Sequence, residues 1–173
     1  EQMLVGFAVE QLRRFQPMVA VTHDVEGEYG HSQHMLCADL MMKACRISMD
    51  PIEYPELAAK YGVWDVPKTY LHLYPDNKIR LDLHIPIEIL GKRTALEAAS
   101  DAYLKHVSQQ VWDFVVSDNY EHSCAEFGLY RTTVGTDTGN DMLENIITYE
   151  EQQKLEEEKQ ASIAASITAS KEA

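Results

Sequence analysis

Two histidines in a glycine-containing stretch have the residue types and spacing to bind a metal ion. His31 and His34 are three residues apart, so at the start of a helix they share one face. The positive end of the helix dipole disfavours a protonated imidazole, and a metal ion needs the neutral ring. Gly27 and Gly30 allow the loop beside them to turn tightly. The pattern predicts half of a zinc site, and the other half is not evident in this chain.

The same H-x-x-H spacing is also found where one histidine is exposed and the other packs in a core. Three features favour a metal here. The pair follows the apolar run 18–22, and ligands bind at the carboxyl ends of strands in open α/β sheets. It opens a helix rather than closing one, and Glu28 and Tyr29 add an acceptor and a donor beside it. His23 and Asp24 end the apolar run and could line a site, but a strand-end Asp more often caps the next turn.

The apolar spacing predicts helices that alternate with strands. The run 18–22 has no polar alternation, which is typical of a parallel strand covered on both faces. Strand alternation on either side of Pro75-Asp76-Asn77 predicts a β-hairpin over 68–83. The remaining predicted elements are helices over 2–16, 31–46, 55–61 and 94–116 and a strand over 127–134. We therefore expect an α/β fold, a partial Rossmann-like (doubly wound) sheet with flanking helices and a β-hairpin.

Composition excludes several classes of function. The chain of 173 residues has 28 acidic and 15 basic residues and a net charge of −13. Nucleic-acid binding needs a basic patch, so DNA and RNA are excluded as main partners. No apolar run approaches the roughly 20 residues of a transmembrane helix. Residues 148–173 are rich in charge, Ala and Ser, and predict a helical linker or tail.

The stretch T-H-D-V-E-G-E-Y-G-H-S-Q-H at 22–34 resembles the second metal motif of the PIG-L/LmbE-like family of zinc-dependent N-deacetylases, which often reads G-x-Y-G-H-P-D-H. Y-L-H-L-Y-P, H-V-S-Q-Q and F-G-L-Y-R-T resemble further parts of that family, so the resemblance covers residues 1–147. It implies that His34 binds Zn²⁺. It also implies that His31 stabilises the reacting oxyanion or transfers protons, and that Tyr29 donates to the oxyanion.

Three further residues are candidates for substrate binding. The resemblance places an H-x-S-Q run at His106 to Gln109, which suggests that these side chains face the pocket, although they could equally satisfy buried polar groups. Arg131 could clamp a carboxylate or phosphate, and an ion pair with an acidic residue is the alternative.

The chain departs from the family pattern in two places. The family's other metal motif, A-H-P-D-D-E, supplies a His and an Asp ligand and the Asp that acts as general base, and no such string is present. Gln33 replaces the Asp before the final histidine, and Ser32 replaces the Pro. Gln33 can form hydrogen bonds but brings no charge. We therefore expect residues 1–147 to be the C-terminal part of a deacetylase domain, with further domains possible at either end.

The resemblance implies zinc-dependent hydrolysis of the N-acetyl group of an amino sugar, such as N-acetylglucosamine, or of its conjugate. Because part of the ligand set is missing, we expect these 173 residues alone to bind zinc weakly and to be inactive. The alternative is a non-catalytic carbohydrate-binding or scaffolding module of a larger protein. The sequence leaves a cytoplasmic and an extracellular location equally open.

Overall fold

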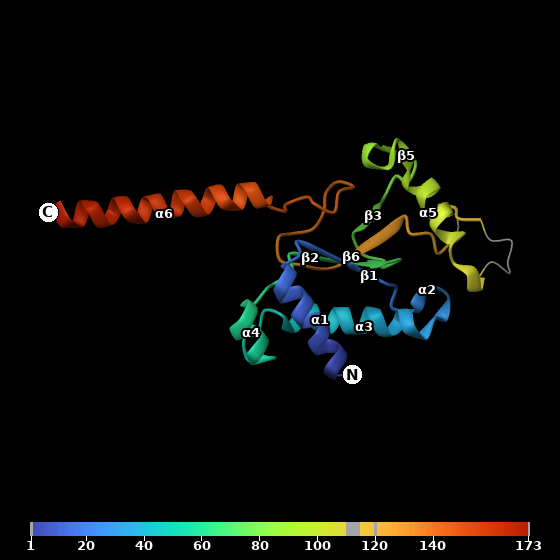
Figure 1. Cartoon of the computed structure of the whole chain (residues 1–173), viewed down its shortest axis with the longest axis horizontal. Coiled ribbons are helices and arrows are strands. Elements are labelled where there is room, and N and C mark those ends of the chain that lie inside the picture. The colour runs from blue at the N-terminus through green and yellow to red at the C-terminus, as the bar shows by residue number, and fades with distance from the viewer. Residues whose placement is uncertain (1, 110–114, 120, 173) are drawn as a thin grey trace.

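The centre of the molecule is a four-stranded mixed sheet in the order β1-β2-β6-β3 (Figure 1). The computed structural model describes residues 2–109, 115–119 and 121–172. β1 and β2 are parallel, and β6 pairs antiparallel with both β2 and β3. The strands of this sheet are β1 (Val19–Thr22), β2 (Lys68–His72), β3 (Lys78–Arg80) and β6 (Glu126–Thr132). A separate two-stranded sheet contains β4 (Pro86–Ile87) and β5 (Arg93–Thr94).

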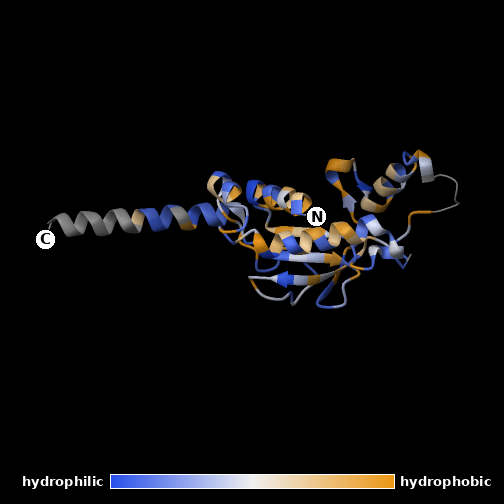
Figure 2. Ribbon diagram, turned by 90° about the horizontal axis from the view of Figure 1, so that it is seen from below, coloured by the Kyte–Doolittle hydropathy of each residue, from blue (hydrophilic) through white to orange (hydrophobic). Residues whose placement is uncertain are grey.

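Helices lie over one face of the sheet, and one long helix extends away from it (Figures 1 and 2). The α-helices are α1 (Gln2–Phe15), α2 (Gly27–Gly30), α3 (Ser32–Ile47), α4 (Pro55–Tyr61), α5 (Ala95–Tyr103) and α6 (Tyr149–Glu172). Two short 3₁₀ helices are η1 (Glu88–Leu90) and η2 (Val107–Gln109). None of the helices in the described residues is long and apolar enough to span a membrane.

The main apolar core lies between α1, α3 and the sheet. Its buried side chains come from both helices, from β1 and from the segment just before β2: Val5, Val9, Leu12, Ala20, Ala44, Cys45 and Val66. The predicted helix over 2–16 is confirmed, and its 3.6-residue apolar spacing is what turns one face of α1 toward this core.

A buried arginine joins α1 to the segment between α3 and α4. The Arg13 side chain is 1% exposed and donates to four backbone carbonyls. Its Nε contacts the Ser48 oxygen at 3.0 Å, and Nη2 contacts the Asp50 oxygen at 2.7 Å. The guanidinium thereby ties the segment between α3 and α4 to α1.

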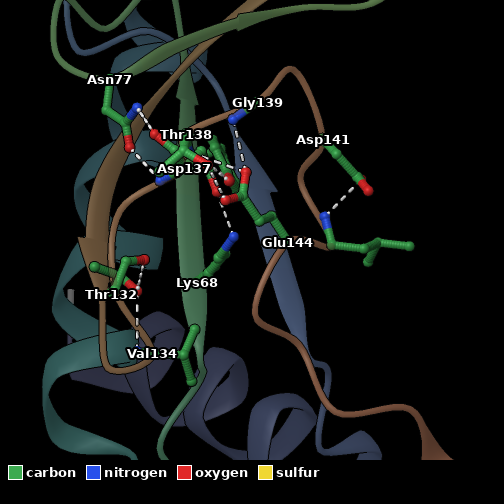
Figure 3. Close-up of polar contacts among 12 residues, drawn as sticks. Lys68, Asn77, Thr132, Val134, Asp137, Thr138, Gly139, Asp141 and Glu144 are labelled. Carbon is green, nitrogen blue, oxygen red and sulfur yellow. Dashed lines mark hydrogen bonds and ion pairs between the residues drawn. The ribbon is translucent and has the colours of Figure 1, made fainter.

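A second buried cation, Lys68, lies on the opposite face of the sheet. Lys68 of β2 pairs with the Asp137 carboxylate, and the Tyr70 hydroxyl donates to the same carboxylate at 2.5 Å (Figure 3). The Asn77 side chain donates to the Asp137 carbonyl at 3.0 Å and accepts from the Asp137 N–H at 2.8 Å. Burial and the Asp137 carboxylate raise the pKa of Tyr70 above its ordinary range. The loop after β6 is thereby tied to the sheet.

The predicted hairpin over 68–83 is wrong. β2 and β3 do not pair with each other, because β6 lies between them and bonds to both. The turn that contains Tyr74 and Asp76 crosses over β6 instead, and the Leu129 N–H donates to the Asp76 carbonyl at 3.0 Å. Gly128 permits this crossing, because a Cβ there would collide with the Tyr74 carbonyl.

Two other expectations need correction. The helix predicted over 94–116 begins with the expected capping box at Thr94 and Glu97, but α5 ends at Tyr103 and its last turn tightens into 3₁₀-type bonds. Part of that predicted helix, 110–114, lies outside the described residues. The strand over 18–22 is confirmed as parallel, but Val21 is 45% exposed. This exposure shows that β1 is not covered on both faces. Among the described strands β1 pairs only with β2, so it is also an edge strand.

The α/β class and the flanking helices are confirmed, whereas the doubly wound pattern is not, because only one strand pair of the described sheet is parallel. The tail is helical as expected, and Figure 2 shows α6 extending from the sheet with hydrophilic residues along its first turns.

Replacing Asp137 tests the buried pair. Asp137→Asn leaves Lys68 buried without a counter-charge, so we expect a loss of about 3–5 kcal/mol in the free energy of unfolding. Asp39→Asn is the matched control, because Asp39 pairs with Lys43 on the surface of α3, and such exposed pairs contribute only about 0.3–0.5 kcal/mol. Urea denaturation measures both. Equal losses in the two variants would contradict a structural role for the buried pair.

Candidate metal centre and active site

The candidate site lies at the carboxyl ends of the two parallel strands. β1 and β2 are in register with Thr22 opposite Leu71, so His23 and His72 come next to each other at this edge of the sheet. The chain then turns through α2 and enters α3, which brings Glu28 and His34 back over the strand ends. Four side chains from three segments therefore meet at one point.

The carboxylate of Glu28 is the centre of this group. Its Oε1 lies 2.8 Å from His72 Nδ1 and 3.2 Å from His23 Nδ1, and it accepts the Asp24 N–H at 3.1 Å. Its Oε2 lies 2.6 Å from His34 Nδ1. The Glu28 side chain is only 7% exposed. His72 in turn donates from Nε2 to the Ser123 carbonyl at 2.8 Å, which fixes the position of its ring.

Glu28 is ionised despite its burial. Burial alone would raise its pKa, but the hydrogen bonds from His72, the Asp24 N–H, His34 and His23 favour the charged form. Together they lower the pKa of Glu28 to about 2. The Glu28 carboxylate therefore carries a negative charge at neutral pH.

An unusual backbone delivers this carboxylate. Glu28 has φ 59° and ψ −73°, a conformation that L-residues rarely adopt. Gly27 before it has φ 69°, and a Cβ there would lie 2.7 Å from Met35 Cγ. Gly30 has φ 80° with open space around it. The tight turn predicted from these two glycines is confirmed.

The three residues of the predicted site lie together. His31 caps α3, and its ring lies 4.3 Å from the His34 ring, which confirms the shared helix face. Tyr29 is 5.8 Å from each of these rings, measured between centroids. Nδ1 of His31 is buried and has no hydrogen-bond partner among the described residues. Their chemical roles stay predictions.

A pocket of about 760 Å³ opens beside this group. Its lining includes the polar side chains of His23, Glu28, Tyr29 and His34. It also includes apolar side chains of α5 and of the segment after β3: Leu83, Ala95, Leu96 and Ala99. A mainly apolar lining with a few polar groups is typical of a small-molecule site.

Of the candidate substrate-binding residues, His106 and Arg131 do not line this pocket. Arg131 donates to the Asp65 carboxylate at 2.6 Å and to the Val66 carbonyl at 3.1 Å, so the ion-pair alternative is the one observed. His106 is exposed just after α5. Gln109 ends η2, and its side chain lies outside the described residues.

Sequence reasoning missed three members of the cluster: His23, Glu28 as its centre, and His72. The sequence places His23 at the end of an apolar run, where it could line a site, and His72 within the predicted hairpin. One signal could have found them, because both histidines end apolar strands and adjacent parallel strands end at the same edge of a sheet. Gln33 is exposed, so the negative charge near His34 comes from Glu28 rather than from the position that carries Asp in the resembling motif.

The cluster has the chemistry of a metal site. One ligand atom from each of His23, Glu28 and His34 lies within 4.8 Å of the other two. Imidazole nitrogen and carboxylate oxygen are the ligands that Zn²⁺ accepts in proteins. These residues therefore fit the zinc that the family resemblance implies.

Comparisons with known proteins point to deacetylases. Over 97 residues the chain is 31% identical to a 1D-myo-inositol 2-acetamido-2-deoxy-alpha-D-glucopyranoside deacetylase of Geodermatophilus obscurus. This match covers 56% of this chain and 32% of the relative. A Streptomyces avermitilis protein of the same name is 33% identical over 101 residues, with the same coverage. The 1D-myo-inositol 2-acetamido-2-deoxy-alpha-D-glucopyranoside deacetylase 2 of Saccharopolyspora erythraea is 39% identical over 72 residues. That match covers 42% of this chain and 25% of the relative.

The chain thus spans about a third of the length of the first two relatives. No protein-family model and no solved structure matches it. The expected resemblance to amino-sugar deacetylases is confirmed for part of the chain. Membership of the wider family stays a prediction.

Alanine substitutions at Gly27 and Gly30 distinguish the cost of backbone strain at positive φ from the cost of a steric clash with Met35. Gly30→Ala adds a side chain in open space at positive φ, so we expect a loss of about 1–2 kcal/mol in the free energy of unfolding. Gly27→Ala adds the same strain and also meets Met35, so its loss should be larger. Urea denaturation of both variants measures the difference, and a Gly27→Ala variant as stable as Gly30→Ala would contradict the packing described here.

Proposed function

We propose that this chain is part of a zinc-dependent deacetylase that hydrolyses the N-acetyl group of an amino sugar or its conjugate. The observation that carries the proposal is the cluster of Tyr29, His31 and His34 beside the buried Glu28 carboxylate, at one side of a pocket. The names of the relatives give the substrate class and reaction. The most direct candidate substrate is their 1D-myo-inositol 2-acetamido-2-deoxy-alpha-D-glucopyranoside.

His34 is the proposed zinc ligand. Its Nδ1 contacts Glu28, and its side chain is 27% exposed toward the pocket. Zinc, when bound, supplies a Lewis acid for the amide carbonyl and activates a water molecule as nucleophile. Glu28 fixes the direction of the His34 ring, as carboxylates next to metal-binding histidines commonly do.

Tyr29 and His31 act on the substrate itself. When water adds to the acetyl carbon, the carbonyl oxygen gains negative charge, and the Tyr29 hydroxyl donates a hydrogen bond to it. His31 gives a proton to the amine nitrogen as the C–N bond breaks, so that the products are acetate and a free amine. The apolar wall formed by Leu96 and Tyr103 keeps water from the rest of the substrate.

Residues 1–147 would form the C-terminal part of the complete domain, and 148–173 a linker or tail. Two observations support this. The match spans a third of the relatives, and β1 is an edge strand with Val21 exposed, where a further parallel strand of a doubly wound sheet could pair. The general base would come from that additional part. The 173 residues alone would then be inactive.

Alanine variants in the longest natural form of the protein test the proposal. His31→Ala should lower kcat/KM for the N-acetylated substrate by about 10²–10⁴-fold, the usual contribution of a positioned acid or base, with zinc content unchanged. His34→Ala should lose both activity and bound zinc. His84→Ala is the control, because His84 is exposed and paired with Asp118 outside the pocket.

Release of primary amine, followed with an amine-reactive dye, measures the activity. If the wild-type protein binds the sugar without releasing amine, the deacetylase proposal fails and a non-catalytic carbohydrate-binding module becomes the better account.

A further inference from the structure

We infer that His122, from the segment just before β6, is a positioning residue that holds the ring of Tyr29 in the direction its reaction needs. This role rests on the proposed function, in which the Tyr29 hydroxyl donates to the oxyanion. In this role His122 binds no zinc and transfers no proton, and it acts on the substrate only through the orientation of Tyr29.

The Tyr29 side chain needs a partner that fixes its direction. The residue is 61% exposed and lines the pocket. A donor to an oxyanion must be aimed at the reacting oxygen before charge develops there, because its benefit comes from fixed geometry. The backbone alone does not aim the hydroxyl, since the side chain can rotate between staggered positions.

Three imidazole rings contact the Tyr29 ring. Its centroid lies 5.8 Å from those of His31 and His34 and 6.2 Å from that of His122. All three pairs are edge to face, with angles of 77°, 67° and 64° between the ring planes, and aromatic pairs prefer this arrangement. His31 and His34 follow Tyr29 closely in the chain. In the part of the chain that the structure describes, His122 is the ring partner that comes from another segment.

A hydrogen-bonded bridge beside this ring pair determines where His122 lies. Ser123, the next residue, accepts at its carbonyl from His72 Nε2 at 2.8 Å. The other ring nitrogen of His72 lies 2.8 Å from Oε1 of Glu28, the residue before Tyr29. The two segments are therefore joined twice, through the His72 bridge and through the rings of Tyr29 and His122. The side chains of His72 and Glu28 are 4% and 7% exposed, so this buried bridge keeps the two rings opposite each other.

The His122 ring can restrict the Tyr29 ring because it is itself largely enclosed. Its side chain is 19% exposed and lines the same pocket. A ring in a fixed position limits the rotamers open to an exposed ring in contact with it. The Tyr29 hydroxyl acts only when negative charge develops on the substrate oxygen, so loss of this contact should lower kcat and leave KM unchanged.

Kinetics of variants in the longest natural form of the protein test this role. His122→Ala should lower kcat by about 2–10-fold, the size of the contribution of one aromatic pair, with KM and zinc content unchanged. His122→Phe keeps an aromatic ring at this position and should restore most of the loss. Asn119→Ala is the matched control, because Asn119 is exposed on the same segment outside the pocket, and it should behave as the wild type does.

A double-mutant cycle shows whether His122 acts through Tyr29. Tyr29→Phe removes the hydroxyl, so adding His122→Ala to that variant should lower kcat no further. An equal loss of kcat in the wild-type and Tyr29→Phe backgrounds overturns the inference. A raised KM with unchanged kcat in His122→Ala also overturns it, because His122 would then contact the substrate itself.

NMR gives a readout that needs no hydrolysis. In protein with isotope-labelled tyrosine, the Tyr29 ring signal is the one that disappears in Tyr29→Phe. It should shift in His122→Ala, because the ring current of a neighbouring ring is lost, and stay in place in Asn119→Ala. An unchanged Tyr29 signal in His122→Ala overturns the inference and leaves the proposed function intact. Absence of amine release by the wild type, in contrast, overturns the proposed function whatever the NMR signal shows.

Discussion

The buried carboxylate of Glu28 is the contact on which the site depends. It joins the end of β1, the end of β2 and the first turn of α3 through His23, His72 and His34. A buried charge without partners is costly, so these contacts together stabilise the carboxylate in its buried position. The backbone of Glu28, with φ 59° and ψ −73°, is one that L-residues rarely adopt, and it occurs at the residue on which the site depends.

Local patterns predicted the helices well. The apolar face of α1, the capping box of α5 and the turn at Gly27 and Gly30 all depend on residues within a few positions of each other. The sheet was harder, because β6 enters between β2 and β3 from a distant part of the sequence. The turn residues after β2 favour a hairpin locally, and only the approach permitted by Gly128 shows that the chain crosses a third strand.

The site was predicted only in part, because some of its residues share a local pattern and others come together from distant parts of the sequence. His31 and His34 have helical spacing, so a local pattern identified them. His23 and His72 are 49 positions apart in the numbering and become neighbours only through the parallel register of β1 and β2. Arg131 had a plausible role in binding an anion, but its ion pair with Asp65 depends on packing that no local pattern contains.

Glu28 and Asp137 both have carboxylates that are almost closed to solvent, and their partners explain why only Glu28 belongs to a candidate site. Asp137 faces Lys68 and Tyr70, and the side chains of Lys68 and Asp137 are fully buried, so its charge is balanced and closed to solvent. Glu28 faces histidines, which have lone pairs when neutral and reach a pocket. An ammonium group cannot give up its place to a metal ion without leaving a charge unpaired, whereas a neutral imidazole can turn its lone pair to one. The choice of partner thus makes one carboxylate a structural contact and leaves the other suited to a cation from outside.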